Sequence, residues 1–157
     1  MLLIVWHSRT GASRALAEAA KAGAGDGARL VAACEVAPED LLEAAGYLFV
    51  CPENLATMSG AMKEMFDRCY YPVLGRIEGR AYATIIAAGS DGSGAQRQLD
   101  RIATGWRLRR VAEPMIVNLK AQTPEEIMAA KLVPPAILNL AQELGDSLGT
   151  GLAMGVF

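Results

Sequence analysis

The sequence predicts a three-layer α/β/α fold, in which helices cover both faces of a doubly wound, five-stranded parallel sheet. Two observations predict it. Apolar runs of strand length alternate with helical patterns along the 157 residues, and these runs are almost continuously hydrophobic, as is typical of strands buried on both faces. In such a sheet a ligand binds outside the carboxyl ends of the strands, where the strand order reverses.

Five segments are predicted as strands because each is short and nearly continuous in apolar side chains. In chain order they are residues 1–6, 28–34, 46–51, 81–88 and a run within 111–118. A turn is expected at 25–28, before the second strand, and Pro52 is expected to end the third strand.

Helices are predicted between the strands from the spacing of apolar side chains. The alanine-rich stretch 14–23 follows the first strand, and a weaker pattern at 38–45 links the second and third. Further along the chain, three stripes at helical spacing are expected to face the sheet. They are Met62, Met65, Phe66 and Cys69; then Leu99, Ile102, Ala103 and Trp106; then Ile137, Leu140, Ala141, Leu144 and Leu148.

The last helical region is predicted to be in two parts. Thr123 and Glu126 enclose Pro124, which gives a helix start with a hydroxyl cap, a first-turn proline and a carboxylate that can reach back. Pro134 and Pro135 then interrupt the helical pattern. The tail at 149–157 is expected to be a loosely held terminus.

Length and composition favour one globular domain over residues 1–157, because 52% hydrophobic residues supply one core and the chain is too short for two ordinary domains.

A net charge of -2 gives no basic field, so no nucleic-acid partner is expected. No run approaches the roughly 20 apolar residues of a membrane span, so none is predicted. Cys34, Cys51 and Cys69 show no disulfide or metal-ligand spacing, which favours a cytoplasmic protein with no metal site.

The loop after the first strand, HSRTGAS at 7–13, has the character of an anion site. Ser8, Thr10 and Ser13 supply hydroxyl groups, and Gly11 lets successive amides converge at the N-terminus of the following helix. The loop lacks both the GxxxxGK[ST] and the GxGxxG motifs. It therefore predicts a monophosphate held without lysine or magnesium.

Three loops together resemble those of the flavodoxin-like superfamily. The pattern S-x-T-G-x-S at Ser8–Ser13 resembles its FMN phosphate loop. Residues 51–68 resemble the segment after the third strand in flavodoxin-like NAD(P)H-dependent reductases of the WrbA type, and residues 88–95 resemble the glycine-rich third flavin loop. The positions that match in the second segment are Pro52, Ser59, Gly60, Lys63 and Asp67. The resemblance implies the sheet order 2-1-3-4-5.

The resemblance also implies that FMN lies across these three loops. The expected contacts are Ser8, Arg9, Thr10, Gly11, Ala12 and Ser13 for the phosphate; Pro52, Glu53, Asn54, Leu55 and Met58 beside the ring; and Gly89, Ser90, Asp91, Gly92 and Gly94, where glycines let the backbone approach the ring. No side chain is expected to act as a catalytic acid or base, because the flavin carries the chemistry.

The function implied is an NAD(P)H-dependent FMN-containing reductase. Residues 52–59 and 89–95 contain no aromatic side chain, whereas flavodoxins usually cover the ring with aromatic residues. An open ring face suits hydride transfer, first from NADH or NADPH and then to a quinone or similar acceptor. Related reductases suggest a homodimer or homotetramer. Two alternatives remain: a flavodoxin-type electron carrier, and a flavin-free α/β module that binds a phosphate or effector.

The sequence allows two interpretations of the role of several side chains. His7 either assists phosphate binding or has a structural role, and Cys51 is either a redox partner of the flavin or a buried core residue. Glu53 either accepts from a ring N–H or is a solvated carboxylate. Ser59 is expected to cap the helix that follows it. The arginines within 97–110 either meet NADPH phosphates or form the solvated face of a helix.

Overall fold

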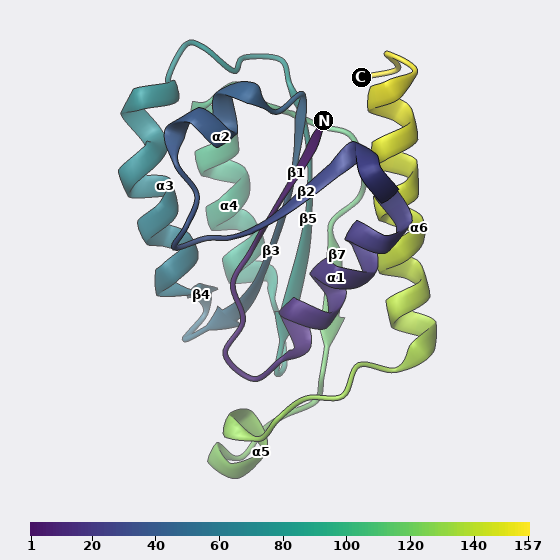
Figure 1. Ribbon diagram of the computed structural model, residues 1–157. Coiled ribbons are helices and arrows are strands. Elements are labelled where there is room, and N and C mark those ends of the chain that lie inside the picture. Colours follow the sequence, from purple (N-terminus) through teal and green to yellow (C-terminus); the bar gives the residue numbers. More distant parts are fainter.

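A parallel sheet with helices on both faces forms the computed structural model, which describes residues 1–157 (Figure 1). Its parallel strands are β1 (Leu2–Trp6), β2 (Ala28–Ala32), β3 (Gly46–Asn54), β5 (Ala81–Ala88), β6 (Arg109–Arg110) and β7 (Met115–Asn118). The order is β2-β1-β3-β5-β6, with β7 also paired to β5. The predicted fold class is confirmed, and the expected fifth strand is present as β7, beside β5.

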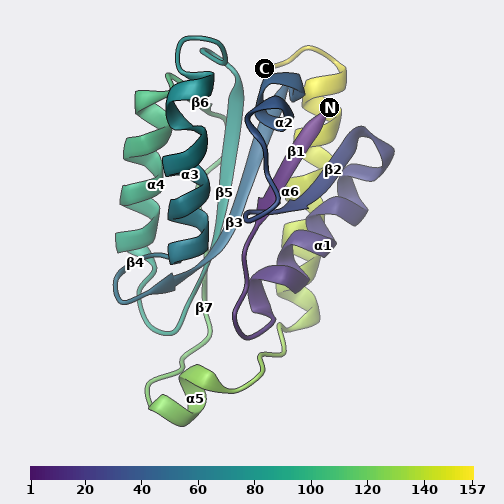
Figure 2. The same ribbon diagram turned by 60° about the vertical axis from the view of Figure 1, so that its left-hand side comes forward.

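Two layers of helices enclose the sheet, as Figure 2 shows. One layer holds α1 (Ala12–Ala24) and α6 (Pro135–Ala153), and the other holds α2 (Pro38–Glu43), α3 (Gly60–Val73) and α4 (Ser93–Gly105). A short 3-10 helix, η1 (Gly25–Gly27), precedes β2. The short helix α5 (Pro124–Met128) belongs to neither layer and lies beyond the carboxyl ends of the strands (Figure 1).

The core is divided into two apolar clusters, one on each face of the sheet. Along β1, Leu3 and Val5 join the cluster under α3 and α4, whereas Leu2 and Ile4 join the cluster under α1 and α6. This alternation follows from the two-residue period of a strand. Since both faces are covered, every residue of the strand must be apolar, which explains the continuous hydrophobic runs.

The third strand extends further than the sequence predicts. β3 continues through Pro52 to Asn54 and turns back as the antiparallel strand β4 (Thr57–Met58). The expectation that Pro52 ends the strand is wrong: Pro52 is paired with Ala87 of β5, and on the other side its carbonyl accepts from the amide of Ser59, just past β4, at 3.2 Å. Proline is tolerated here because β1 has already ended at Trp6, so no β1 carbonyl needs the amide that Pro52 lacks.

The C-terminal region is divided at Pro134–Pro135, as predicted, into α5 and α6. The predicted capping box is also present. The Thr123 hydroxyl accepts from the Glu126 amide at 3.2 Å, and the Glu126 carboxylate accepts from the Thr123 amide at 3.1 Å. The tail is not loose. α6 continues to Ala153, and a Cβ placed on Gly151 would lie 2.2 Å from the ring of Phe157, which packs against it.

Helices α1 and α6 approach so closely that only glycine fits between them. A Cβ on Gly23 would lie 1.9 Å from the carbonyl oxygen of Gln142, and a Cβ on Gly145 would lie 1.9 Å from that of Ala20. The long helix α6 therefore holds α1 in place along its length. The position of α1 in turn fixes the loop between β1 and α1.

Candidate functional site

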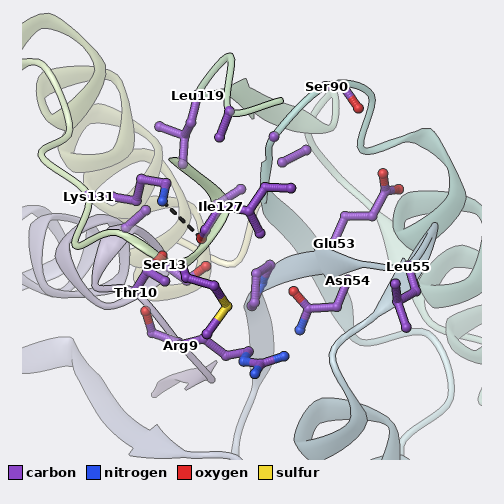
Figure 3. Close-up of a pocket in the computed structure, with 18 of the residues that line it drawn as sticks. Arg9, Thr10, Ser13, Glu53, Asn54, Leu55, Ser90, Leu119, Ile127 and Lys131 are labelled. Atoms are coloured by element: carbon purple, nitrogen blue, oxygen red, sulfur yellow. Dashed lines mark hydrogen bonds between the residues drawn. The ribbon is translucent and has the colours of Figure 1, made fainter. Parts of the chain in front are cut away.

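A cavity of about 490 Å³ opens at the carboxyl edge of the sheet, within the range usual for ligand sites. The loops after β1, β3 and β5 form three of its sides, and the segment after β7 forms the fourth (Figure 3). The structure brings together eleven of the residues expected to contact FMN. They are Ser8, Arg9, Thr10, Ala12, Ser13, Pro52, Glu53, Asn54, Leu55, Gly89 and Ser90.

The N-terminus of α1 opens toward this cavity with unpaired amides. Gly11 is the N-cap, and its φ of 101° lies in the left-handed region that glycine adopts easily. The amide of Ala15 is the first to bond within the helix, to the carbonyl of Gly11 at 3.0 Å. The amides of residues 12–14 consequently have no helical partner, and the helix dipole makes this end attractive to an anion. The Ser8 hydroxyl accepts from the Gly11 amide at 3.1 Å, which shapes the loop.

Ser13 carries the clearest sign of a missing ligand. The residue is only 1% exposed, and its hydroxyl oxygen has no hydrogen-bond partner in the protein. A buried hydroxyl left unpaired costs about 1–3 kcal/mol, so such groups are rare unless a ligand or water satisfies them. Because Ser13 lies in the first turn of α1 and lines the cavity, its hydroxyl and the free amides can address the same anion.

The β3–β4 hairpin forms the second side of the cavity. Leu55 and Ala56 make its two-residue turn with φ of 51° and 62°, the left-handed pair that a type I′ turn requires and that Asn-Gly usually supplies. Non-glycine residues in this region store strain of about 1–3 kcal/mol each, which tends to be tolerated at functional sites. Leu55 is 98% exposed at the tip, so it lies free at the mouth of the cavity.

Glu53 has a role that neither of the two interpretations of the sequence predicted. Its two carboxylate oxygens accept from the amides of Gly92 at 2.9 Å and Ala95 at 3.0 Å. The side chain therefore caps the N-terminus of α4, where a negative charge also meets the positive end of the helix dipole. This contact fixes the hairpin to the third loop and uses the carboxylate within the protein.

The glycines of the third loop serve the packing of the chain. A Cβ on Gly89 would lie 2.7 Å from the Ala121 carbonyl oxygen, and one on Gly94 would lie 2.1 Å from that of Ala56. At Gly92 a Cβ would lie 2.5 Å from the side chain of Ile116. Other parts of the protein fill the space into which each Cβ would point, and of these three glycines only Gly89 lines the cavity.

Five of the expected contacts do not line the cavity. Met58 is 2% exposed and packs in the core under α3 and α4, so it is not beside the cavity. Asp91 is exposed and bonds to Ser93, and these hydrogen bonds lower the pKa of its carboxyl group. The other three are Gly11, Gly92 and Gly94, which have the structural roles described above.

The segment after β7 contributes residues that the sequence did not point to. They are Leu119, Ala121, Ile127, Met128 and Lys131; the β3–β4 turn adds Ala56, and the end of β5 adds Ala87 and Ala88. The available signal was positional: this segment leaves the carboxyl end of a parallel strand, as the other three loops do. The capping box at Thr123 located a helix there but did not place it beside the first loop.

His7 and Cys51 have structural roles. His7 Nδ1 lies 2.9 Å from the Ser59 hydroxyl, and burial, followed by the charge of Arg9, lowers the pKa of the imidazole. Ser59 stands at the N-cap of α3, but its side chain makes no capping bond because it meets His7 instead, which corrects the expected cap. Burial raises the pKa of the Cys51 thiol to about 12, so it is a protonated core residue.

The arginines within 97–110 do not converge on the cavity. Arg109 and Arg110 form β6, which pairs with the first residues of β5, at the edge of the sheet opposite the site. Arg107 pairs with Glu78 at 3.2 Å, and Arg110 pairs with Asp100 at 3.1 Å. These three side chains are exposed, but they lie beyond the end of α4 and so do not form the face of a helix.

Comparison with known proteins identifies a family. A sequence profile described as NADPH-dependent FMN reductase matches residues 30–123, more than half of the chain. A protein of Aquifex aeolicus named flavodoxin is 31% identical over 97 residues, which cover 59% of this chain and 52% of that protein. The chain thus spans about half the length of this curated relative.

Solved structures share the fold at low sequence identity. A flavodoxin from the domain Archaea superposes with a TM-score of 0.79 at 15% identity, covering 97% of this chain and 98% of that one. A flavodoxin, WrbA-like protein from Agrobacterium tumefaciens gives 0.77 at 17% identity, covering 98% and 97%. None of the helices in the structure is long and apolar enough to span a membrane.

Proposed function

The chain belongs to the NADPH-dependent FMN reductase family, and on that premise we propose that it is an oxidoreductase that passes hydride from NAD(P)H through FMN to a quinone or similar acceptor. The family description and the Aquifex relative named flavodoxin both indicate FMN as the cofactor. We propose further that residues 1–157 act as one FMN-binding domain.

The residues present fit this cofactor. The unpaired hydroxyl of Ser13 and the free amides of α1 offer a phosphate ester the donors that it needs. Thr10 lines the cavity beside them and supplies a second hydroxyl. We propose that these groups hold the phosphate and that the remaining lining residues hold the ring.

The protein's own residues orient the cofactor and exclude water. When bound, FMN supplies a ring that accepts and donates hydride. Asn54 offers amide groups to the polar edge of the ring, and the hairpin that carries it is held in place by the cap of Glu53 on α4. Ile127 and Met128 of α5 add apolar surface to the lining of the cavity. No side chain is assigned as an acid or base.

One observation supports a reductase over a carrier: no aromatic side chain lines the cavity. Hydride transfer requires the nicotinamide to stack on the flavin ring at van der Waals distance, and a tyrosine or tryptophan over the ring would occupy that place. With no aromatic side chain over it, a ring face remains accessible to the nicotinamide and then to the acceptor.

A carrier function is the second candidate, favoured by the relative named flavodoxin. Such a protein passes single electrons to a partner protein and needs no site for NAD(P)H.

A cytoplasmic location and assembly as a homodimer or homotetramer stay predictions.

A visible spectrum distinguishes the candidates. The purified protein is saturated with FMN, and its absorbance is recorded before and after anaerobic addition of NADPH or NADH, and again after a quinone. The reductase is supported if NAD(P)H bleaches the flavin and the quinone restores it over many turnovers. Bound flavin that accepts electrons from dithionite but not from NAD(P)H indicates a carrier. Failure to retain FMN at saturating concentration contradicts both.

A further inference from the structure

The segment that carries α5 is attached to the rest of the protein mainly at its two ends. At one end the amide of Ala121 donates to the Gly89 carbonyl at 3.0 Å, and at the other the amide of Lys131 donates to the Thr10 carbonyl at 2.8 Å. Residues 122–130 between them are all exposed. Lys131 therefore holds the α5 segment against the loop expected to bind phosphate.

Lys131 is a partly exposed residue whose ammonium group has only neutral partners. It donates to the carbonyl oxygens of Glu126, Ile127 and Ala129, the last two at 3.1 and 2.6 Å. No carboxylate lies within ion-pair distance of it. In Figure 3 it lies on the same side of the cavity as Thr10 and Ser13.

The other charged side chains at the cavity are less suited to a phosphate. Glu53 is negative and caps α4. Arg9 is exposed, so water and salt screen its charge. The backbone of Lys131 lies near the unpaired end of α1, since a Cβ on Gly11 would lie 3.8 Å from the Lys131 carbonyl oxygen, and Lys131 lines the same cavity as Ser13.

We propose that Lys131 is the counter-charge of the flavin phosphate and makes the site select phosphorylated flavin over riboflavin. The assignment rests on the proposed function and differs from the expectation of a phosphate held without lysine. On binding, one ammonium N–H exchanges a neutral carbonyl for a dianionic oxygen, and such charge-assisted bonds are about twice as strong as neutral ones. Ser13, the α1 amides and Lys131 then enclose the phosphate.

The test compares FMN with riboflavin, measured by quenching of flavin fluorescence at low ionic strength. Lys131→Gln is expected to raise the Kd of FMN about 10- to 100-fold, as expected for losing a hydrogen bond to a charged group, and to change that of riboflavin less than about twofold. Lys131→Arg should retain most of the affinity. Lys120→Gln is the matched control, because it removes the same charge from the same segment outside the cavity and should leave both values unchanged.

A second measurement needs no flavin. Inorganic phosphate should raise the Tm of the flavin-free wild type by binding the folded state, and should raise that of Lys131→Gln less. Equal losses for FMN and riboflavin would show that Lys131 only holds α5 in place, and would overturn the assignment. The assignment would also be overturned if Lys131→Gln left the Kd of FMN unchanged, or if Arg9→Gln alone weakened FMN binding. Wild-type protein that binds neither flavin overturns the proposed function instead.

Discussion

Ser13 is a buried polar side chain that the protein itself leaves without a hydrogen-bond partner. Its buried hydroxyl has no partner, although alanine would fill nearly the same space without a polar group. Fold stability alone would favour alanine, so the hydroxyl is best explained by a ligand that bonds to it.

Ser13→Ala is accordingly expected to act in opposite directions on stability and binding. The free energy of unfolding of the flavin-free protein should stay unchanged or rise by about 1–2 kcal/mol, because an unsatisfied buried group is removed. The Kd of FMN should rise at least about tenfold, with little change for riboflavin. Urea unfolding and flavin titration measure the two effects. Ser90→Ala is the control, because it removes an exposed hydroxyl group from another side of the cavity. If Ser13→Ala weakened the binding of FMN and riboflavin equally, the phosphate assignment would be contradicted.

The free energy of unfolding is expected to depend on pH through His7. Burial and Arg9 lower its pKa in the folded protein, while the unfolded chain keeps the ordinary value of about 6.5. Between the two values the unfolded state binds more protons, so the contribution of His7 is present above pH 6.5 and is lost as the pH falls through the folded pKa. His7→Asn should show a smaller decrease in unfolding free energy between pH 6.5 and 5.5. A variant with the wild-type pH slope would contradict this explanation.

At the scale of elements, the contact between α1 and α6 positions the site. Gly145 lies against the backbone of Ala20, so a methyl group there must push the two helices apart. Because α1 begins at the loop proposed to bind phosphate, a shift of the helix also displaces Ser13 and the free amides.

Gly145→Ala is expected to destabilise the protein by about 1–3 kcal/mol, the usual effect of overpacking, even though alanine favours a helix. FMN affinity should fall with it. Gly60→Ala, at the first residue of α3 with nothing within 4 Å of the added Cβ, is the matched control and should be neutral or slightly stabilising. Thermal unfolding and FMN titration of both variants make the comparison, and a Gly145→Ala protein as stable as Gly60→Ala would refute it.

At the scale of the whole molecule, the groups proposed to bind the ligand lie at one edge of the sheet, and the ion pairs of Arg107 and Arg110 lie at the other. β6 joins the first residues of β5, whereas Ala87 and Ala88 at its far end line the cavity. A ligand held at the carboxyl edge should therefore leave the opposite edge unchanged.

Hydrogen exchange can map this division. Saturating FMN should slow amide exchange in residues 8–14, 53–56, 89–92 and 119–131, and leave residues 76–80 and 107–110 as they are without ligand. Protection of 119–131 by FMN but not by riboflavin would accord with a phosphate that joins α5 to the first loop. Protection centred on 107–110 would place the ligand elsewhere and contradict the site.

The sequence by itself determined the parallel sheet, its two helical layers and the edge at which the site forms. Those features follow from local patterns: continuous apolar runs require burial on both faces, and parallel strands bring their carboxyl ends together. The hydroxyl-rich turn before α1 and the capping box at Thr123 are also local, because their partners lie within a few residues.

Only the tertiary structure decided which polar groups remain available to a ligand. Glu53 is used by amides about 40 positions along the chain, the third-loop glycines fit against distant backbone, and Lys131 reaches the first loop from beyond β7. A side chain pairs with whatever group folding places next to it, and no local pattern records that neighbour. The sequence could therefore locate the site, but only the packing of the elements shows which of its charges can meet a ligand.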